Sequence, residues 1–160
     1  MPPPCTDNIV VFASHVAELN QCVTYSAHTA RHSAWGNVVS KKRILLIEDD
    51  GSLQVALRYL LEDLGYDLVI AGDREQALAA IADGEYDAAI VDYFLNNVPS
   101  SDLIAQLRTC SPAMPLICST AAFAEQIKLD ESVRPDAILY KPFAVGELRD
   151  TLNSLMRTVA

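Results

Sequence analysis

Four short apolar runs, each followed by polar side chains, constrain the fold of this chain more than any other feature. The runs cover residues 44–47, 88–91, 116–119 and 137–140. Apolar runs of this length are typical of parallel strands that are buried on both faces. Because the carboxyl ends of parallel strands meet at one edge of a sheet, the polar groups that follow the runs are expected to share one site. These groups are Glu48, Asp49 and Asp50 after the first run, Asp92 after the second, Thr120 after the third and Lys141 after the fourth.

Amphipathic stretches between the runs predict helices. Apolar residues recur at helical spacing from Leu53 through Ala56 to Leu64, and Gly65 is expected to end that helix. A fifth strand is predicted at 68–71, followed by a helix from Asp73 to about Ala82. Further helices are expected near 103–107, at 122–129 and around Leu148, Leu152 and Leu155. Residues 41–160 therefore predict an α/β fold of five strand–helix repeats, doubly wound, with a parallel sheet covered on both faces.

Composition narrows the class of protein. An apolar content of 51% with 21% charged residues is typical of a globular chain. The net charge of −9 argues against a nucleic-acid surface, which needs clustered Lys and Arg. The sequence contains no apolar stretch of the roughly 18 residues that a membrane span requires, and no basic segment ahead of an apolar core at its start. A cytoplasmic protein without membrane contact is expected.

The chemistry of the predicted site suits a divalent cation and a phosphoryl group. A carboxylate attacks an anionic phosphoryl group poorly because like charges repel, and a bridging Mg²⁺ removes that repulsion. Mg²⁺ prefers oxygen ligands, and a lysine supplies a point charge for phosphoryl oxygens. Taken singly, Asp92 has an ordinary interpretation as a turn residue, and the acidic run 48–50 as a helix N-terminal charge run. Their coincidence with Thr120 and Lys141 favours a functional site.

These motifs resemble the receiver domain of two-component response regulators. The segments that carry the resemblance are 43–50, 89–95, 115–121 and 139–143, and the match covers about residues 41–157. The resemblance implies a flavodoxin-like fold and a single-domain regulator of the chemotaxis-regulator-like type. The implied site consists of Asp92 as phosphoacceptor, Glu48, Asp49, Asp92 and the backbone carbonyl of Phe94 as Mg²⁺ ligands, Thr120 and Lys141 as phosphoryl contacts, and a cis bond between Lys141 and Pro142.

The implied function is signalling rather than turnover catalysis. A histidine kinase or a histidine phosphotransfer protein would donate the phosphoryl group to Asp92. A downstream protein would then dock on the fourth helix, the fifth strand and the fifth helix. Only one helix fits between Phe143 and Ala160, so no output domain is expected. Self-dephosphorylation is expected to be slow, because Phe94 and Ala122 lack the polar atoms that would orient an attacking water.

Three positions depart from the usual receiver pattern. Asn96 stands where receivers often carry proline, and Ser100 where glycine is usual. The loop 96–101 is therefore expected to differ in shape. Ile138 occupies the position of a common aromatic switch residue, which argues against a rotamer switch coupled to Thr120.

Other functions remain open as alternatives. A haloacid-dehalogenase-like phosphatase needs a second acid two residues after its nucleophile, where this chain has Phe94. A nucleotide-binding protein needs a glycine-rich loop after the first strand, where Glu48, Asp49 and Asp50 stand. A receiver-like module that binds partners without phosphorylation is the third alternative.

Residues 1–40 lie outside the repeats and form an ill-defined N-terminal extension to the predicted domain at 41–160. Two interpretations stay open. In the first, the given start lies upstream of the true one, which is Val38 or Val39. In the second, the segment is a flexible or helical extension with its own contacts.

Overall fold

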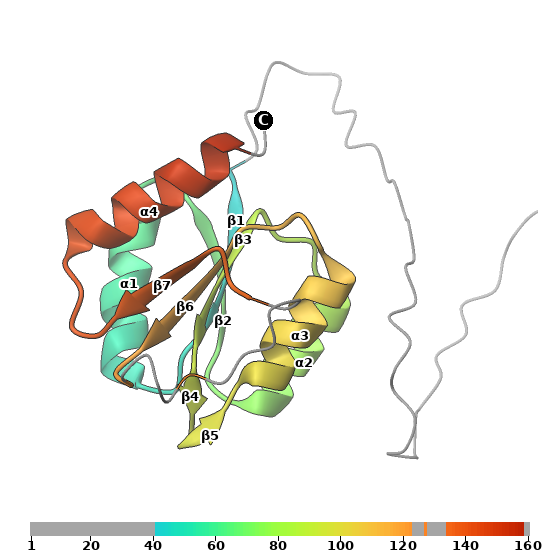
Figure 1. The fold of residues 1–160 in the computed structure, drawn as a ribbon. Helices are drawn as coiled ribbons and strands as arrows, with labels where there is room; N and C mark the ends of the chain where they lie inside the picture. The colour runs from blue at the N-terminus through green and yellow to red at the C-terminus, as the bar shows by residue number, and fades with distance from the viewer. Residues whose placement is uncertain (1–40, 123–126, 128–133, 159–160) are drawn as a thin grey trace, which may run out of the picture.

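The five predicted strands form one parallel sheet with the order β2-β1-β3-β6-β7. Helices cover both faces, as Figure 1 shows, which confirms the predicted α/β fold. The computed structural model describes residues 41–122, 127 and 134–158. The strands of the sheet are β1 Arg43–Ile47, β2 Asp67–Ala71, β3 Ala88–Asp92, β6 Leu116–Thr120 and β7 Ala137–Tyr140. The helices are α1 Gly51–Asp63, α2 Arg74–Asp83, α3 Ser101–Cys110 and α4 Val145–Thr158.

Alternation along the strands divides the core into two layers. Ile44 and Leu46 of β1 face one side of the sheet, whereas Leu45 and Ile47 face the other. The first side packs against α1 and α4, and the second against α2 and α3 (Figure 1). All five residues of β3 are buried, because β3 is the central strand and has a neighbour on each side.

Helix α1 begins and ends where the sequence predicts. The side chain of Asp50 accepts hydrogen bonds from the backbone amides of Ser52 and Leu53, so this third acid of the run is the N-cap. Gly65 has a φ of +89°. The Gly65 amide donates to the Glu62 carbonyl, and the next amide along the chain donates to the Leu61 carbonyl. This Schellman arrangement needs a left-handed residue, which glycine provides.

Helix α2 begins at the predicted N-cap. The Asp73 carboxylate accepts from the Gln76 amide at 2.8 Å, and the Gln76 side chain accepts from the Gly72 amide at 2.9 Å. One detail of the helix predictions was wrong, because Ala56 is exposed on α1. Leu155 of α4 is partly buried and packs against the core as predicted, and Met156, which was not predicted, is buried next to it. A methionine fills this part of the core because its unbranched chain adapts to an irregular space.

Arg108 of α3 joins three segments by hydrogen bonds at the amino-terminal edge of the sheet. It donates to the carbonyls of Met114 at 2.8 Å and Arg134 at 3.2 Å, and to the Asp136 carboxylate at 2.6 Å. Asp136 also accepts from the Leu116 amide at 2.8 Å, which joins β6 to the same network. The edge that carries the predicted site lies at the opposite ends of these strands.

Two short strands were not predicted. Strands β4 Phe94–Leu95 and β5 Val98–Pro99 pair antiparallel directly after β3. The extension 1–40 and most of the predicted helix 122–129 lie outside the described residues. Over the part of the chain that is described, no helix is long and apolar enough to cross a membrane.

Candidate functional site

The ends of β1, β3 and β7 place an acid, a second acid and a lysine on the same side of the sheet. Glu48 continues the face that carries Ile44 and Leu46, and Lys141 continues the face of Leu139. Asp92 follows Ile90 on that face in the same way. Register therefore brings these side chains together although they are far apart in sequence.

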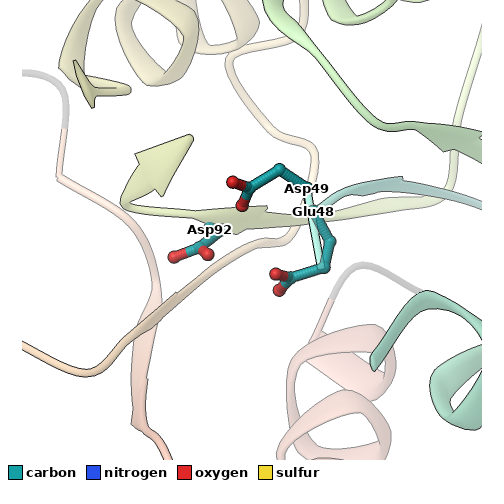
Figure 2. A group of neighbouring side chains, drawn as sticks. All are labelled: Glu48, Asp49 and Asp92. Carbon is teal, nitrogen blue, oxygen red and sulfur yellow. The ribbon is translucent and has the colours of Figure 1, made fainter. Parts of the chain in front are cut away.

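Three carboxylates converge at this edge. One oxygen from each of Glu48, Asp49 and Asp92 lies within 4.8 Å of the others. Figure 2 shows these side chains at the ends of β1 and β3. Glu48 is 1% exposed and Asp92 is 7% exposed, whereas Asp49 is exposed to solvent. Three carboxylates this close together repel one another, and a nearby cation reduces that repulsion.

Lys141 supplies part of that positive charge. Its Nζ donates to Oε2 of Glu48 at 2.7 Å and to Oδ2 of Asp92 at 2.7 Å. Burial of the ammonium group disfavours its charge, but the hydrogen bonds to Asp92 and Glu48 outweigh this effect and raise the pKa of Lys141. The lysine therefore stays protonated at neutral pH. The peptide bond from Lys141 to Pro142 is cis.

Glu48 is held on both its side chain and its backbone. Burial raises the pKa of its carboxyl group, and the hydrogen bond from Lys141 opposes that rise. The Glu48 amide donates to the carbonyl of Ala71 at 3.1 Å, which joins it to β2. Its carbonyl accepts from Nε2 of Gln54 at 2.5 Å. The backbone of the acidic pair is thus fixed between β2 and α1.

Asp92 is oriented by the chain that follows it. Oδ1 accepts from the Phe94 amide at 3.2 Å, so Phe94 and Lys141 bind different oxygens of the same carboxylate. The Phe94 ring packs edge-on against Tyr93, with ring centroids 4.9 Å apart. The Tyr93 amide donates to the Ser119 carbonyl at 2.8 Å and extends the pairing of β3 with β6 by one residue.

Asp49 is held by the unexpected hairpin. Its Oδ2 accepts from the backbone amide of Asn96 at 3.0 Å. Asn96 and Asn97 have φ values of 52° and 62°, and together they close the turn between β4 and β5. The loop 96–101 contains a two-residue turn of left-handed residues, and its predicted difference in shape from other receivers stays a prediction.

Thr120 lies beside these groups without a bond to Asp92 in the described structure. Its hydroxyl is buried and accepts from the Ala122 amide at 3.0 Å. Its carbonyl accepts from the Lys141 amide at 2.7 Å, which links the ends of β6 and β7.

Cys118, two residues before Thr120, is a buried free thiol. Burial, with a smaller effect from the Asp92 charge, raises the pKa of Cys118 to about 12.

Two residues in contact with the acids were missed in the sequence. Gln54 gives no local signal, because its bond to the Glu48 carbonyl depends on how α1 packs against β1. The consecutive Asn96 and Asn97 were a usable signal, since adjacent asparagines favour two-residue hairpin turns.

The chain also matches known proteins. The family model described as "Response regulator receiver domain" matches residues 44–153. The sensory/regulatory protein RpfC of Xanthomonas campestris pv. campestris is 30% identical over 151 residues, covering 91% of this chain and 20% of RpfC. The response regulator MprA of Mycobacterium sp. strain KMS is 32% identical over 118 residues, covering 72% of this chain and 50% of MprA. The chain thus spans a fifth to a half of these relatives.

Solved structures give the same result. A CheY-like response regulator receiver domain protein from Methanospirillum hungatei JF-1 has a TM-score of 0.70 and 26% identity, covering 75% of this chain and 97% of that one. The response regulator protein TrrA from Thermotoga maritima, solved in complex with Mg(2+)-BeF, has a TM-score of 0.64 and 25% identity, covering 71% of this chain and 98% of that one. The chain therefore belongs to the response regulator receiver domain family of two-component systems.

Proposed function

We propose that this protein accepts a phosphoryl group on Asp92 in a Mg²⁺-dependent reaction with a histidine kinase or a histidine phosphotransfer protein. One observation carries the proposal. The Asp92 carboxylate lies close to two further carboxylates and accepts a hydrogen bond from the ammonium group of Lys141, so that groups suited to a metal ion and to a phosphoryl anion are found together. The TrrA structure supports it, because that relative was solved with Mg(2+)-BeF.

The residues present fit a magnesium ion. Mg²⁺ prefers carboxylate, carbonyl and water oxygens. Asp49 and Asp92 would bind it directly, with Glu48 nearby and the backbone carbonyl of Phe94 as a further ligand. Bound there, the ion would offset the repulsion between Asp92 and an incoming phosphoryl group.

The chain's own groups prepare Asp92 for attack. A carboxylate oxygen of Asp92 would form the new bond to phosphorus, while the bond from phosphorus to the imidazole nitrogen of the donor breaks. The amide of Phe94 and the ammonium of Lys141 hold the carboxylate from its two oxygens. Lys141 would then pair with a phosphoryl oxygen. Thr120 would donate its hydroxyl proton to another phosphoryl oxygen.

The modified protein would act as a signal rather than as a turnover enzyme. Phe94 stands two residues after Asp92, and Ala122 stands two residues after Thr120. Neither has a polar atom that would position a water for attack on the acyl phosphate, so self-dephosphorylation would be slow.

The output would be a docking event on the face formed by β7, α4 and the segment before β7. Ile138 and Tyr140 of β7 are 37% and 47% exposed, and Val145 at the start of α4 is 60% exposed. A pocket of about 490 Å³ is lined by Ile127, by Ile138 and Tyr140, and by residues 134–137. Exposed apolar groups around a pocket fit a protein partner.

We propose that residues 41–160 form the domain that carries this activity. We place the protein in the cytoplasm, because ATP is available to a kinase there.

Incubation with acetyl phosphate and Mg²⁺, read by intact mass, tests the proposal. The wild type should gain the mass of one phosphoryl group, and Asp92→Asn should gain none. A wild type that stays unmodified, although it binds Mg²⁺, would favour the alternative of a binding module that works without phosphorylation. Rapid, repeated release of phosphate from a phosphomonoester would favour the phosphatase alternative.

A further inference from the structure

We propose that the turn Asn96–Asn97 is a positioning element that holds Asp49 ready for the metal ion, through the backbone amide of Asn96. The inference rests on the proposed function, because it concerns how the same pocket binds Mg²⁺. It assigns a role to Asn96 and Asn97, which are not among the acids, the threonine and the lysine of the site.

The contact joins distant parts of the chain. Asn96 N lies 3.0 Å from Oδ2 of Asp49, and the two residues are 47 positions apart. Within the described residues, this is the hydrogen bond that the Asp49 carboxylate makes. Asp49 is exposed, so without the bond its side chain would rotate among several conformations.

The turn is itself fixed in place. Asn96 and Asn97 adopt left-handed φ values, which asparagine tolerates better than most residues. Strands β4 and β5 pair on either side of the turn. Leu95 is 2% exposed and packs in the core layer of α2 and α3. At the base of the hairpin, the Ser100 amide donates to the Tyr93 carbonyl at 2.8 Å. The Asn96 amide is therefore held by the core rather than by a free loop.

The bond leaves the other oxygen of Asp49 for a metal ion. One Asp49 oxygen already lies within 4.8 Å of ligand atoms on Glu48 and Asp92. A ligand held in position loses less conformational entropy when the ion binds, so affinity rises. Proline at this position would have no N–H and a φ near −65°, so it could neither make the bond nor close this turn. Asn96, where receivers often have proline, therefore makes a contact with Asp49 that proline could not make.

Two substitutions separate the amide from the side chain. Asn96→Gly keeps the N–H and the left-handed φ, whereas Asn96→Pro removes both. Calorimetric titration with MgCl₂ should give a Kd for Asn96→Gly within about twofold of the wild type, and a Kd for Asn96→Pro about tenfold weaker. Equal affinity of the proline variant and the wild type would overturn the proposal, as would an equal loss in the glycine variant.

A measurement without metal ions tests the hydrogen bond itself, so that a general effect of proline on the fold is not mistaken for loss of the bond. Amide hydrogen exchange at Asn96, in the absence of Mg²⁺, should be faster in Asp49→Ala than in the wild type. Unchanged exchange would show that the bond does not persist in solution, and would overturn the proposal.

Failure of this inference can be told from failure of the proposed function. If the wild type neither binds Mg²⁺ nor takes up a phosphoryl group, the proposed function itself is wrong. If the wild type does both and the proline variant binds Mg²⁺ equally well, only the role of the turn is wrong.

Discussion

Nζ of Lys141 lies 2.7 Å from Oδ2 of Asp92, although the two residues are 49 positions apart in sequence and strand β6 separates β3 from β7. The same ammonium group is 2.7 Å from Oε2 of Glu48. One lysine therefore compensates two buried carboxylates. This relationship makes Lys141 a determinant of stability as well as of chemistry.

Lys141→Met should lower the free energy of unfolding by about 2 kcal/mol, a value between those of exposed and fully buried ion pairs. Denaturant unfolding without metal measures the change. Added Mg²⁺ should stabilise the variant more than the wild type, because the ion would replace the lost charge. Arg149→Met is the matched control, since its pair with Asp150 is exposed and should contribute little. An equal effect of both substitutions would contradict the account.

The stabilisation by Lys141 should depend on pH in one direction. Its folded-state pKa is raised above the ordinary value of 10.5 by hydrogen bonds that outweigh burial. A group of this kind stabilises the fold fully below its unfolded-state pKa, and the effect disappears as pH rises through the folded-state value. The stability difference between wild type and Lys141→Met should therefore shrink above pH 10.5. A difference that grows in that range would show that the lysine acts otherwise.

Arg108 should stabilise the fold without affecting the site. Its side chain is 13% exposed and binds two carbonyls and the Asp136 carboxylate within 3.2 Å. Arg108→Met should lower the free energy of unfolding by about 2 kcal/mol, because the part-buried Met114 carbonyl loses its donor, whereas the more exposed acceptors at Arg134 and Asp136 can bind water instead. Arg74→Met, which removes the exposed pair with Asp102, should cost at most about 1 kcal/mol. Phosphorylation of folded Arg108→Met should match the wild type, and a lost acceptance of phosphate would contradict the separation of fold and site.

Cys118 should resist alkylation in the folded protein. Burial raises the pKa of its thiol from 9.0 to about 12, and the thiolate is the reactive form. At pH 9, iodoacetamide should label the peptide that contains Cys118 slowly in the native protein and rapidly in denaturant. The neutral thiol favours the fold fully below pH 9, and this contribution is lost as pH rises toward 12. Equal labelling rates in the two states would show that the thiol is accessible.

The lifetime of the phosphorylated form tests the proposed effect of the apolar residues Phe94 and Ala122. After removal of acetyl phosphate, the modified wild type should persist for minutes or longer. Phe94→Asn should shorten this lifetime, because an amide side chain two residues from Asp92 would orient an attacking water. Intact mass followed over time measures both decays. A wild-type half-life of seconds would contradict the prediction.

Much of the fold could be predicted because the sequence carries its signals locally. Buried runs such as 88–91 are continuous and apolar, and the capping acid Asp50 and the stop at Gly65 act within a few residues. The convergence of the strand ends follows from the rule that parallel strands present their carboxyl ends at one edge. The hydrogen bond from Gln54 to the Glu48 carbonyl could not be predicted, since it depends on the packing of α1 against β1. The same holds for the contact of Asn96 with Asp49.

The position of the phosphoryl group tests the central claim most directly. After incubation with acetyl phosphate and Mg²⁺, borohydride reduction converts an aspartyl phosphate to homoserine, which peptide mass spectrometry locates. We predict homoserine at position 92 alone, and none when EDTA removes the metal. Modification at Asp49 or Asp50 in place of Asp92, or modification that persists without metal, would contradict the account.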